Sequence, residues 1–451
     1  MAEEQHRVVI VGGGFAGLHA ARGLRNKPVQ VTLLDRRNFH LFQPLLYQVA
    51  TGWLSPANIA APLRVVLRGQ ENAQVLLAEA VDFDVLNRRV ILSDGEIPYE
   101  TLIVATGSGF HYFGHDEWEP LAPGLKTIED ATDIRRRIFQ AFEAAERAGK
   151  REVLCEWLTF VIVGGGPTGV ELAGALGEIV QDLIKYDFRK VNPADVRILL
   201  VEGMERILPP YPPELSTRAQ EFLARLGVAV RTGSMVEDIR YNTVTIRSKD
   251  TSETIQCRTV LWAAGVSASS LGRLLAKKTG AKLDRSGRVM VEADLSVAGH
   301  PNIFVLGDLA HFAHGSDKPL PAVATVALQQ GRYVATLLNN RMRGKRADPF
   351  KFKDRGSMAI VGRAAAVADF GRIRCAGFGA WLIWLFVHLM NLVGFHNRVL
   401  VLIQWGWAYF TRNRAARLIT GEGKELLPAV KVNRQNTQDD GAANASANLR
   451  E

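Results

Sequence analysis

Cysteine is scarce in this chain, with Cys155, Cys257 and Cys375 widely separated among 451 residues. This spacing excludes a disulfide-stapled scaffold and a cysteine-based zinc or iron–sulfur centre, and we predict no metal site. We expect each cysteine to be a core residue, in a reducing compartment. We also expect no signal peptide, because the acidic start leads directly into a glycine-rich motif at Gly12. We therefore expect the protein to work in the cytosol or at its membrane face.

Charge of one sign is only moderately in excess. The chain has 55 Lys and Arg against 46 Asp and Glu, a formal net charge of +9. That balance suits either a nucleic acid or an anionic membrane surface. Outside the C-terminal segment there is no basic stripe with interleaved aromatic residues, so we do not expect nucleic acid as a partner. The 47% hydrophobic and 22% charged content is ordinary for a globular protein of several domains.

Two segments of the chain resemble each other. HRVVIVGGGFAGLHAA lies near the start, and LTFVIVGGGPTGVELAG begins at Leu158. Each has a β-branched run, a G-x-G-x-x-G motif and a helix start rich in small residues, which indicates two similar domains. In such a motif the first glycine (Gly12) allows a tight turn, the second (Gly14) admits a pyrophosphate, and the third (Gly17) lets the helix pack on the sheet. The pyrophosphate would then lie at the helix N-terminus.

An acidic residue follows each motif at the end of the next predicted strand. VQVTLLD ends in Asp35, and VRILLVE ends in Glu202 after a longer spacing than usual. A carboxylate at this position binds the ribose hydroxyls of a dinucleotide. In the second copy it favours NADH over NADPH, because it would repel a 2′-phosphate, although Arg206 lies close in sequence.

Three further strand ends support two nucleotide sites. YETLIVATG ends at Gly107 and RTVLWAAGV passes through Gly265, and each resembles a strand that returns to its nucleotide. The segment IFVLGD puts Asp308 at the end of another strand. There a carboxylate and a helix N-terminus would meet a ribityl chain and a flavin ring.

The order GGGFAG, VATG, GGGPTGVE, AAGV and VLGD resembles the flavoprotein oxidoreductases with two dinucleotides, over about residues 8–331. NFHLFQPLLYQVATG, WAAGV, PAVATVALQQGRYVA and KDRGSMAIVGRAAAVADF resemble more narrowly the type II NADH dehydrogenases, the single-subunit NADH:quinone oxidoreductases. The resemblance implies FAD and NADH as cofactors and a membrane quinone as acceptor. No cysteine pair follows Asp35, which excludes the disulfide-reductase branch and argues against sulfide:quinone oxidoreductase.

The predicted fold is α/β, with two Rossmann-like dinucleotide-binding domains and a C-terminal membrane-associating helical segment. The predicted divisions are residues 1–119 (first part of the FAD-binding domain), 120–151 (connector), 152–300 (NADH-binding domain), 301–375 (return of the FAD-binding domain, with the flavin and quinone segment), 376–425 (amphipathic anchoring helices) and 426–451 (polar, disordered tail).

Motifs and resemblance together assign candidate residues to each ligand. Glu171 matches the family's glutamate near the nicotinamide and is the catalytic candidate. In the segment ATVALQQG, which corresponds to the family's AQxAxQxG motif, Gln329 matches and Thr325 replaces the first glutamine. These two are the quinone candidates, and backbone amides near Thr325 would meet the flavin ring. The FAD candidates are Gly12, Gly13, Gly14, Phe15, Ala16, Gly17, Asp35, Arg36, Asn38, Val81, Ala105, Thr106, Gly107, Asp308, Thr325, Ala327 and Leu328. The NADH candidates are Gly164, Gly166, Pro167, Thr168, Gly169, Glu171, Glu202, Ala264 and Gly265.

The segment from Gly377 to Phe410 is strongly apolar and rich in tryptophan. Polar residues recur in it, with His388, Asn391 and Arg398 at helical spacing on one stripe. We expect a peripheral, monotopic anchor in the membrane interface, at the cytoplasmic face of the cell membrane, rather than a membrane span or a buried dimer helix. The aromatic residues expected at the interface are Trp381, Trp384, Trp405, Trp407 and Tyr409. The basic residues expected to contact anionic headgroups are Arg412, Arg414 and Arg417.

Two other functions compete with an NADH:quinone oxidoreductase. A soluble flavoprotein reductase of a protein acceptor, such as a ferredoxin or rubredoxin, shares the nucleotide motifs but not the Trp-rich basic tail. A redox-responsive binding protein would turn over slowly with every acceptor. The family that the chain resembles often forms homodimers, but no interface can be read from this sequence, so the oligomeric state stays open. We expect no proton pumping, because the sequence has no set of spanning helices with buried charges.

Overall fold

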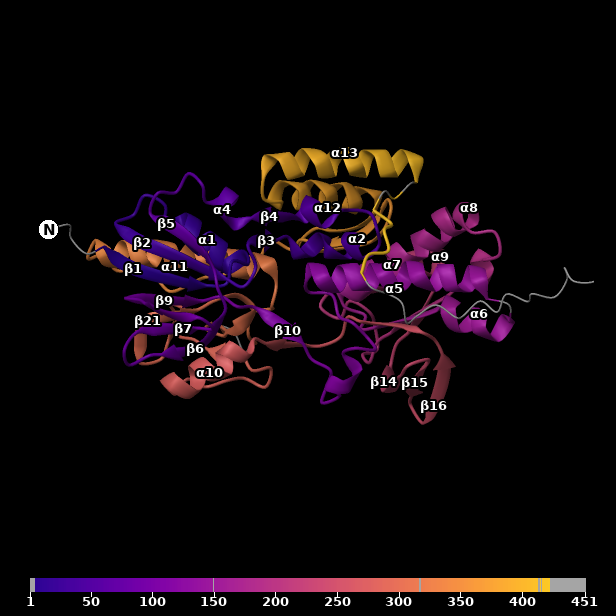
Figure 1. The fold of residues 1–451 in the computed structure, drawn as a ribbon, viewed down its shortest axis with the longest axis horizontal. Coiled ribbons are helices and arrows are strands. Elements are labelled where there is room, and N and C mark those ends of the chain that lie inside the picture. Colours follow the sequence, from indigo (N-terminus) through magenta and orange to yellow (C-terminus); the bar gives the residue numbers. More distant parts are fainter. Residues whose placement is uncertain (1–4, 149, 316–317, 413, 415, 422–451) are drawn as a thin grey trace, which may run out of the picture.

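The computed structural model describes residues 5–148, 150–315, 318–412, 414 and 416–421. The predicted tail at 426–451 and the last four residues of the predicted anchor lie outside this range. Two α/β units lie side by side along the long axis, and two C-terminal helices lie together on one face (Figure 1). The prediction of an α/β fold with two nucleotide-binding units and a helical C-terminal segment is confirmed at this level.

The first unit contains a six-stranded sheet in the order β20-β21-β9-β1-β2-β5. All neighbours are parallel except β20 and β21. The central strands are nearly continuous runs of buried β-branched and leucine residues, as expected for a parallel sheet covered on both faces. The strands are β1 (His6–Val11), β2 (Val29–Asp35), β5 (Ala73–Leu77), β9 (Thr101–Val104), β20 (Ser296–Val297) and β21 (His300–Val305). Helices α1 (Phe15–Gly23), α4 (Leu63–Val66), α10 (Ser270–Thr279) and α11 (Ala324–Met342) accompany this sheet.

Smaller elements complete the first unit. β3 (Phe39–Leu41) pairs with β4 (Ala60–Pro62), and β6 (Ala80–Asp84), β7 (Arg89–Leu92) and β8 (Gly95–Pro98) form an antiparallel sheet. β10 (Ser108–Phe110) pairs with β18 (Val266–Ala268), and β19 (Val289–Met290) pairs with β22 (Ala310–His311). The short helices α2 (Leu46–Ala50) and α3 (Pro56–Ile59) lead toward the second unit.

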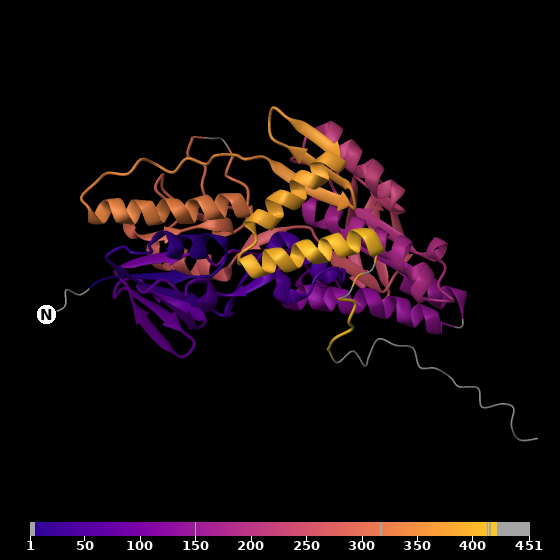
Figure 2. The ribbon, with the colours of Figure 1, turned by 90° about the horizontal axis from the view of Figure 1, so that it is seen from above.

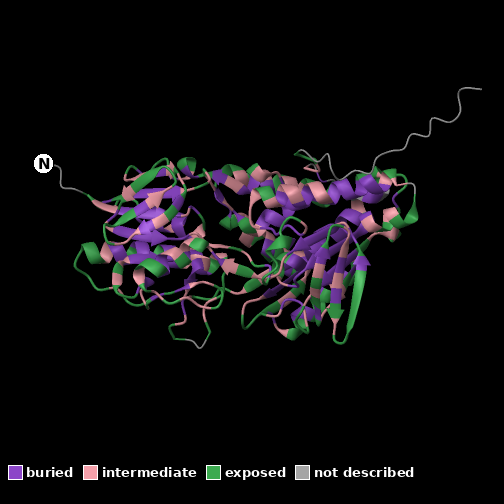
Figure 3. Cartoon of the chain, turned by 60° about the horizontal axis from the view of Figure 1, so that its bottom comes forward, coloured by how far each residue is buried: buried purple, intermediate pink, exposed green. Residues whose placement is uncertain are grey.

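The second unit contains a four-stranded parallel sheet in the order β13-β12-β11-β17. Figure 3 shows buried residues concentrated in the sheets of both units. The predicted connector contains the helix α5, which starts with a capping box between Thr127 and Asp130. The parallel strands of the second unit are β11 (Thr159–Val163), β12 (Arg197–Val201), β13 (Val228–Arg231) and β17 (Thr259–Trp262). The second unit also has an antiparallel sheet of β14 (Ser234–Arg240), β15 (Thr243–Ser248) and β16 (Thr251–Gln256). Its helices are α5 (Ile128–Arg147), α6 (Arg151–Leu158), α7 (Pro167–Ile179), α8 (Lys185–Asp187) and α9 (Pro213–Arg225).

The C-terminal segment forms an antiparallel sheet and two helices. The elements are β23 (Ser357–Gly362), β24 (Ala365–Asp369), β25 (Arg374–Gly377), α12 (Phe378–Asn391) and α13 (Phe395–Thr411). Seen from above, α13 crosses the junction of the two units (Figure 2). The chain reverses at Gly394, which has φ = 92°, so the predicted polar stripe that joined His388, Asn391 and Arg398 is split between two helices.

Helices α12 and α13 are apolar on both their inner and outer faces. Trp384 and Trp405 are buried against the rest of the chain, whereas Phe386 and Trp407 are each 66% exposed. In the part of the chain that the structure describes, no helix is both long and apolar enough to cross a membrane.

The cysteine predictions are correct only in part. Cys257 is buried and Cys375 is half-buried, but Cys155 is exposed on α6. The prediction of a core position for Cys155 was wrong, because this helix presents that position to solvent.

Candidate functional site

The loop between β1 and α1 is tight on one side and open on the other. Gly12 has φ = 106°, and a side chain there would overlap the carbonyl oxygen of Ala105. A methyl group on Gly17 would overlap the carbonyl oxygen of Gly12, because the helix packs directly on the loop. Around Gly14, in contrast, nothing lies within 4 Å of the position that a side chain would take. The loop therefore leaves room for a pyrophosphate at the N-terminus of α1.

The loop between β11 and α7 repeats this geometry. Gly164 has φ = 108° and lies against the backbone of Ala263 and Ala264. A methyl group on Gly169 would overlap the carbonyl oxygen of Gly164, and nothing lies within 4 Å above Gly166. Two loops of the same shape therefore offer two dinucleotide sites.

Each predicted ribose carboxylate is fixed by its own glycine loop. The Gly13 amide donates to Asp35 Oδ2 at 2.6 Å, and the Arg37 amide donates to its Oδ1 at 2.7 Å. The Gly165 amide donates to Glu202 Oε2 at 2.6 Å in the same way. Burial raises the pKa of Asp35, and these two amides oppose that effect. Both carboxylates thus lie beside the loops that they were predicted to serve.

A polar cluster lies where the first sheet meets the start of α11. The Ser108 hydroxyl donates to Asp308 Oδ2 at 2.8 Å, and Lys126 Nζ donates to Ser108 Oγ at 2.9 Å. The Gly307 amide donates to the side-chain oxygen of Gln330 at 2.7 Å. The sequence reasoning missed Ser108, Lys126 and Gln330, although Ser108 directly follows the predicted segment ending at Gly107.

Two buried polar groups in this region fit an absent cofactor. Within the described residues, the Thr106 hydroxyl and the Gln330 amide nitrogen are buried without a hydrogen-bond partner. Buried polar atoms are normally paired, so these two groups suit a ligand with a polar edge, such as a flavin. The residues present therefore fit FAD.

The other FAD candidates lie around this region in different settings. Arg36 and Asn38 follow β2 and have exposed side chains, and Val81 on β6 is 42% exposed. At the start of α11, Thr325 is exposed and Ala327 is buried. Their roles toward the flavin stay predictions.

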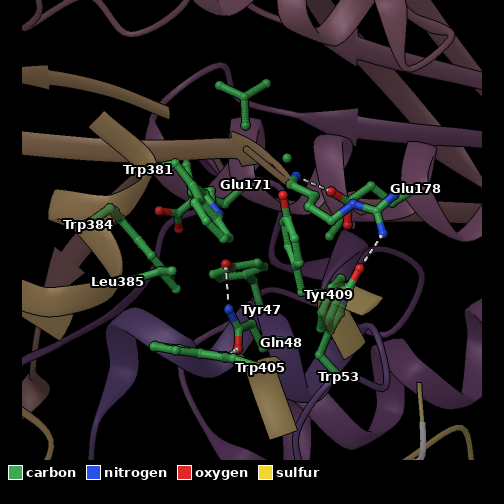
Figure 4. Close-up of a pocket in the computed structure, with 15 residues that line it drawn as sticks. Tyr47, Gln48, Trp53, Glu171, Glu178, Trp381, Trp384, Leu385, Trp405 and Tyr409 are labelled. Atoms are coloured by element: carbon green, nitrogen blue, oxygen red, sulfur yellow. Dashed lines mark hydrogen bonds between the residues drawn. The ribbon is translucent and has the colours of Figure 1, made fainter. Parts of the chain in front are cut away.

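A cavity between α7 and the C-terminal segment contains Glu171 (Figure 4). Its volume is about 50 Å³, and most of its wall is aromatic or aliphatic. A wall of this composition suits an apolar ligand that makes a few polar contacts. Residues labelled at its wall are Tyr47, Gln48, Trp53, Glu171, Glu178, Trp381, Trp384, Leu385, Trp405 and Tyr409.

The shifted pKa values of Glu171 and Tyr47 favour the neutral form of both side chains at pH 7. Burial raises the pKa of Glu171 to about 8, and a hydrogen bond from the Ile360 amide offsets part of this shift. Burial also raises the pKa of Tyr47 well above its ordinary value, and the nearby Glu171 adds to the effect. The cavity therefore holds a carboxyl group that carries a proton near neutral pH, as general acids do.

A buried ion pair lies behind the cavity wall, to which Glu178 belongs. Arg414 Nη2 lies 2.9 Å from Glu178 Oε2, and Arg414 Nη1 donates to the Thr51 carbonyl at 3.1 Å. The Arg414 guanidinium also lies 4.6 Å from the ring centroid of Trp53. The side chain of Arg414 is only 2% exposed, so the prediction that it meets lipid headgroups is wrong.

The neighbouring arginines are also engaged with carboxylates. Arg412 lies 3.6 Å from Asp182, and Arg417 pairs with Asp187. The basic end of the C-terminal segment therefore forms ion pairs with carboxylates of the second unit.

The two quinone candidates lie outside the cavity wall. Gln329 exchanges two hydrogen bonds with the backbone of Lys353, each 3.0 Å long. Thr325 is exposed at the start of α11. The structure thus brings Glu171 together with Tyr47, Gln48 and the tryptophans of α12 and α13, but not with Gln329 or Thr325. No cluster of metal-ligating side chains occurs among the described residues.

The comparisons first define the class of protein. Residues 6–331 match the family model of pyridine nucleotide-disulphide oxidoreductases, and residues 355–413 match the NDH2 C-terminal domain. The structure of NDH2 from Plasmodium falciparum in complex with NADH has a TM-score of 0.84 at 20% identity, covering 91% of this chain and 99% of that one. A sulfide:quinone oxidoreductase from Aquifex aeolicus has a TM-score of 0.70 at 18% identity, with 86% and 90% covered.

Relatives in sequence define the family within that class. The type II NADH:quinone oxidoreductase NdhA of Mycobacterium tuberculosis is 44% identical, over 93% of this chain and 90% of that protein. The type II enzyme of Staphylococcus haemolyticus is 29% identical, over 80% and 89%. The chain belongs to the type II NADH:quinone oxidoreductase family, which confirms the resemblance inferred from its motifs.

Proposed function

We propose that the protein takes electrons from NADH through a bound FAD and reduces a membrane quinone, without pumping protons. Membership of the type II family supports this activity. The observation that carries the proposal furthest is the cavity around Glu171, because it joins the second nucleotide helix to the apolar C-terminal helices. A lipid-soluble acceptor and a protonated carboxyl group would meet there.

The second nucleotide loop supports NADH rather than NADPH as donor. Glu202 lies at the position that would contact the ribose, where its charge would repel a 2′-phosphate. Arg206 donates instead to the carbonyl oxygens of Tyr211 and Pro209, so its charge is not paired with Glu202. Arg206 therefore does not neutralise Glu202, and this supports the preference for NADH over NADPH.

Glu171 supplies a proton in the quinone half-reaction. A bound flavin would supply an acceptor for the hydride of NADH and a donor of two electrons and one proton to the quinone. Reduction of a quinone to a quinol needs two electrons and two protons. Since the pKa of Glu171 is raised to about 8, its carboxyl group holds the second proton at neutral pH and regains it from water after each turnover.

We also propose that α12 and α13 lie on the cytoplasmic surface of the membrane. Phe395, Ile403 and Phe410 are 80%, 62% and 83% exposed, and they are apolar. An amphipathic helix buries such a face among lipid headgroups and acyl chains. Because α12 and α13 also form the cavity wall, quinone would enter from the lipid side. Homodimerisation is a further proposal, which analytical ultracentrifugation in detergent tests.

Anaerobic mixing tests the whole proposal. The detergent-solubilised protein is mixed with excess NADH and then with a short-chain quinone, while the flavin absorbance is followed. Fast bleaching by NADH and fast recovery with quinone are the expected results. Fast bleaching without recovery would reject quinone and indicate a protein acceptor. Bleaching by NADPH but not by NADH would show that the role of Glu202 has been misread.

A further inference from the structure

A chain of hydrogen bonds leads from the anchoring helix α13 into the cavity. Trp405 Nε1 donates to Gln48 Oε1 at 2.8 Å, and Gln48 Nε2 donates to Tyr47 Oη at 2.8 Å (Figure 4). Trp405 and Gln48 are separated by 357 positions in the sequence, so only the packing of α13 against α2 brings them together. All three side chains are buried or nearly so.

The chemistry of the three groups fixes the direction of this chain. An indole N–H can only donate, so the oxygen of the Gln48 amide must face Trp405. The nitrogen of the same amide then faces Tyr47, whose oxygen must accept. The hydroxyl hydrogen of Tyr47 is therefore left for another acceptor. In the described part of the chain, no protein atom accepts it at hydrogen-bond distance.

This hydrogen is available to a ligand in the cavity. Tyr47 lines the cavity together with Glu171, on the side opposite its contact with Gln48 (Figure 4). Burial keeps the phenol protonated, so Tyr47 can donate a hydrogen bond but does not give up its proton at neutral pH. A ligand that satisfies this donor needs an exposed acceptor oxygen on an otherwise apolar body, and a quinone has both.

We propose that Tyr47 donates a hydrogen bond to a carbonyl oxygen of the quinone, and that Trp405 and Gln48 are positioning residues that keep this donor aimed into the cavity. The inference rests on the proposed function and adds a substrate contact to it. Quinone plus two electrons and two protons gives quinol. The electrons and one proton come from the reduced flavin and the other proton comes from Glu171, while Tyr47 keeps its own. The membrane anchor then forms part of the quinone site through the Trp405 indole.

Tyr47→Phe is the direct test, since it removes the donor and keeps the ring. Flavin reduction by NADH should keep its wild-type rate. Reoxidation of the flavin by a short-chain quinone should slow about tenfold, the effect of one neutral hydrogen bond. Binding of a non-reducible quinone analogue to the oxidised holoenzyme, followed by flavin fluorescence, should weaken by a similar factor. Unchanged reoxidation and unchanged binding would overturn the inference.

Trp405→Phe tests the relay, because a smaller aromatic ring replaces the indole and the N–H donor is lost. Gln48 is then free to turn its oxygen to Tyr47 and accept the hydroxyl hydrogen, so reoxidation should again slow. In the Tyr47→Phe background the same substitution should have almost no further effect on reoxidation or on binding of the analogue. Equal effects of Trp405→Phe in both backgrounds would show a packing role and overturn the relay.

Trp384→Phe is the matched comparison on the neighbouring helix. Trp384 is also a buried tryptophan at the cavity wall, but its indole nitrogen has no hydrogen-bond partner among the described residues. Whatever its effect on quinone affinity, that effect should be equal in the wild-type and Tyr47→Phe backgrounds. If the wild-type flavin is not reoxidised by any quinone, the proposed function itself fails. If quinone reoxidises the wild-type flavin and the Tyr47 and Trp405 variants react as fast as the wild type, the proposed function stands and this inference fails.

Discussion

The two nucleotide loops are almost identical in shape, but the helices that follow them have different surroundings. The residue two positions after the last glycine is His19 in α1 and Glu171 in α7. Burial and nearby arginines lower the pKa of His19 to about 4, whereas burial raises the pKa of Glu171 to about 8. Both side chains are therefore neutral at pH 7, by opposite shifts. One lies next to positive charge, and the other faces a cavity.

The surroundings of α1 and α7 differ because a different element packs on each helix. In the first unit, Gly331 of α11 lies against the backbone of Ala16, so helix packs on helix. In the second unit, Gly174 of α7 lies against the carbonyl oxygen of Val361, so α7 packs on strand β23 of the C-terminal segment. That segment closes the cavity over Glu171. The two loops have the same shape, and the element that packs on each helix decides whether a cavity forms beside the loop.

Adding one methyl group to each loop should separate the two sites most strongly. In Gly17→Ala and Gly169→Ala the methyl group meets a carbonyl oxygen that cannot move far. Such overpacking costs about 3 kcal/mol, or about 100-fold in a binding constant. The first variant should be purified without flavin absorbance. The second should keep its flavin but lose reduction by NADH.

The control for this pair is Gly95→Ala, where nothing lies within 4 Å of the added methyl group. It should keep both flavin and NADH reduction. Flavin retained in Gly17→Ala would contradict the assignment of the first loop to FAD.

Glu171→Gln should separate the two half-reactions. The amide cannot supply a proton, so quinone reduction should fall about 100-fold, the usual effect of losing a general acid. In the wild type, the rate of the quinone step should fall as pH rises through about 8, because the carboxyl group loses its proton there. The variant should show no such step. Stopped-flow reoxidation between pH 6 and 10 measures both, and a wild-type rate that rises with pH would contradict the role.

The glycine loops and their carboxylates could be predicted because their requirements are local. A tight turn needs glycine at Gly12 and Gly164, and the following strand carries Asp35 or Glu202 to the same sheet edge. The position of Glu171 on its helix followed from the same motif. These features depend on a few neighbouring residues, so the sequence pattern was sufficient.

The wall of the cavity could not be predicted, because it depends on packing over long distances. Trp405 appeared in the sequence only as an interfacial aromatic residue, but its indole donates to Gln48 from the opposite part of the chain. Arg414 appeared as a basic residue for headgroups, but Glu178 pairs with it in the interior. A charge pattern shows how many basic residues there are, and does not show which carboxylate lies opposite each one.

Breaking the ion pair behind the cavity should destabilise the second unit. Arg414→Met leaves the buried carboxylate of Glu178 without its partner, and loss of one member of a buried pair costs about 3–5 kcal/mol. Thermal unfolding followed by circular dichroism should show a clearly lower Tm. The double variant Glu178→Leu with Arg414→Met should recover much of the loss. Arg218→Met, which breaks an exposed pair with Glu221, is the control and should leave Tm nearly unchanged.

The smallest effect is expected at His19, and it should depend on pH. In the unfolded chain His19 takes up a proton as pH falls below 6.5, but in the folded protein its pKa is about 4, so folding loses stability as pH falls from 6.5 toward 4. His19→Gln removes this loss. Its unfolding free energy should equal that of the wild type at pH 7 within about 0.5 kcal/mol, as for a change without charge. At pH 5 the variant should be the more stable of the two by about 1–2 kcal/mol. Urea unfolding at both pH values measures the difference, which should vanish if burial and the nearby arginines do not lower the pKa of His19.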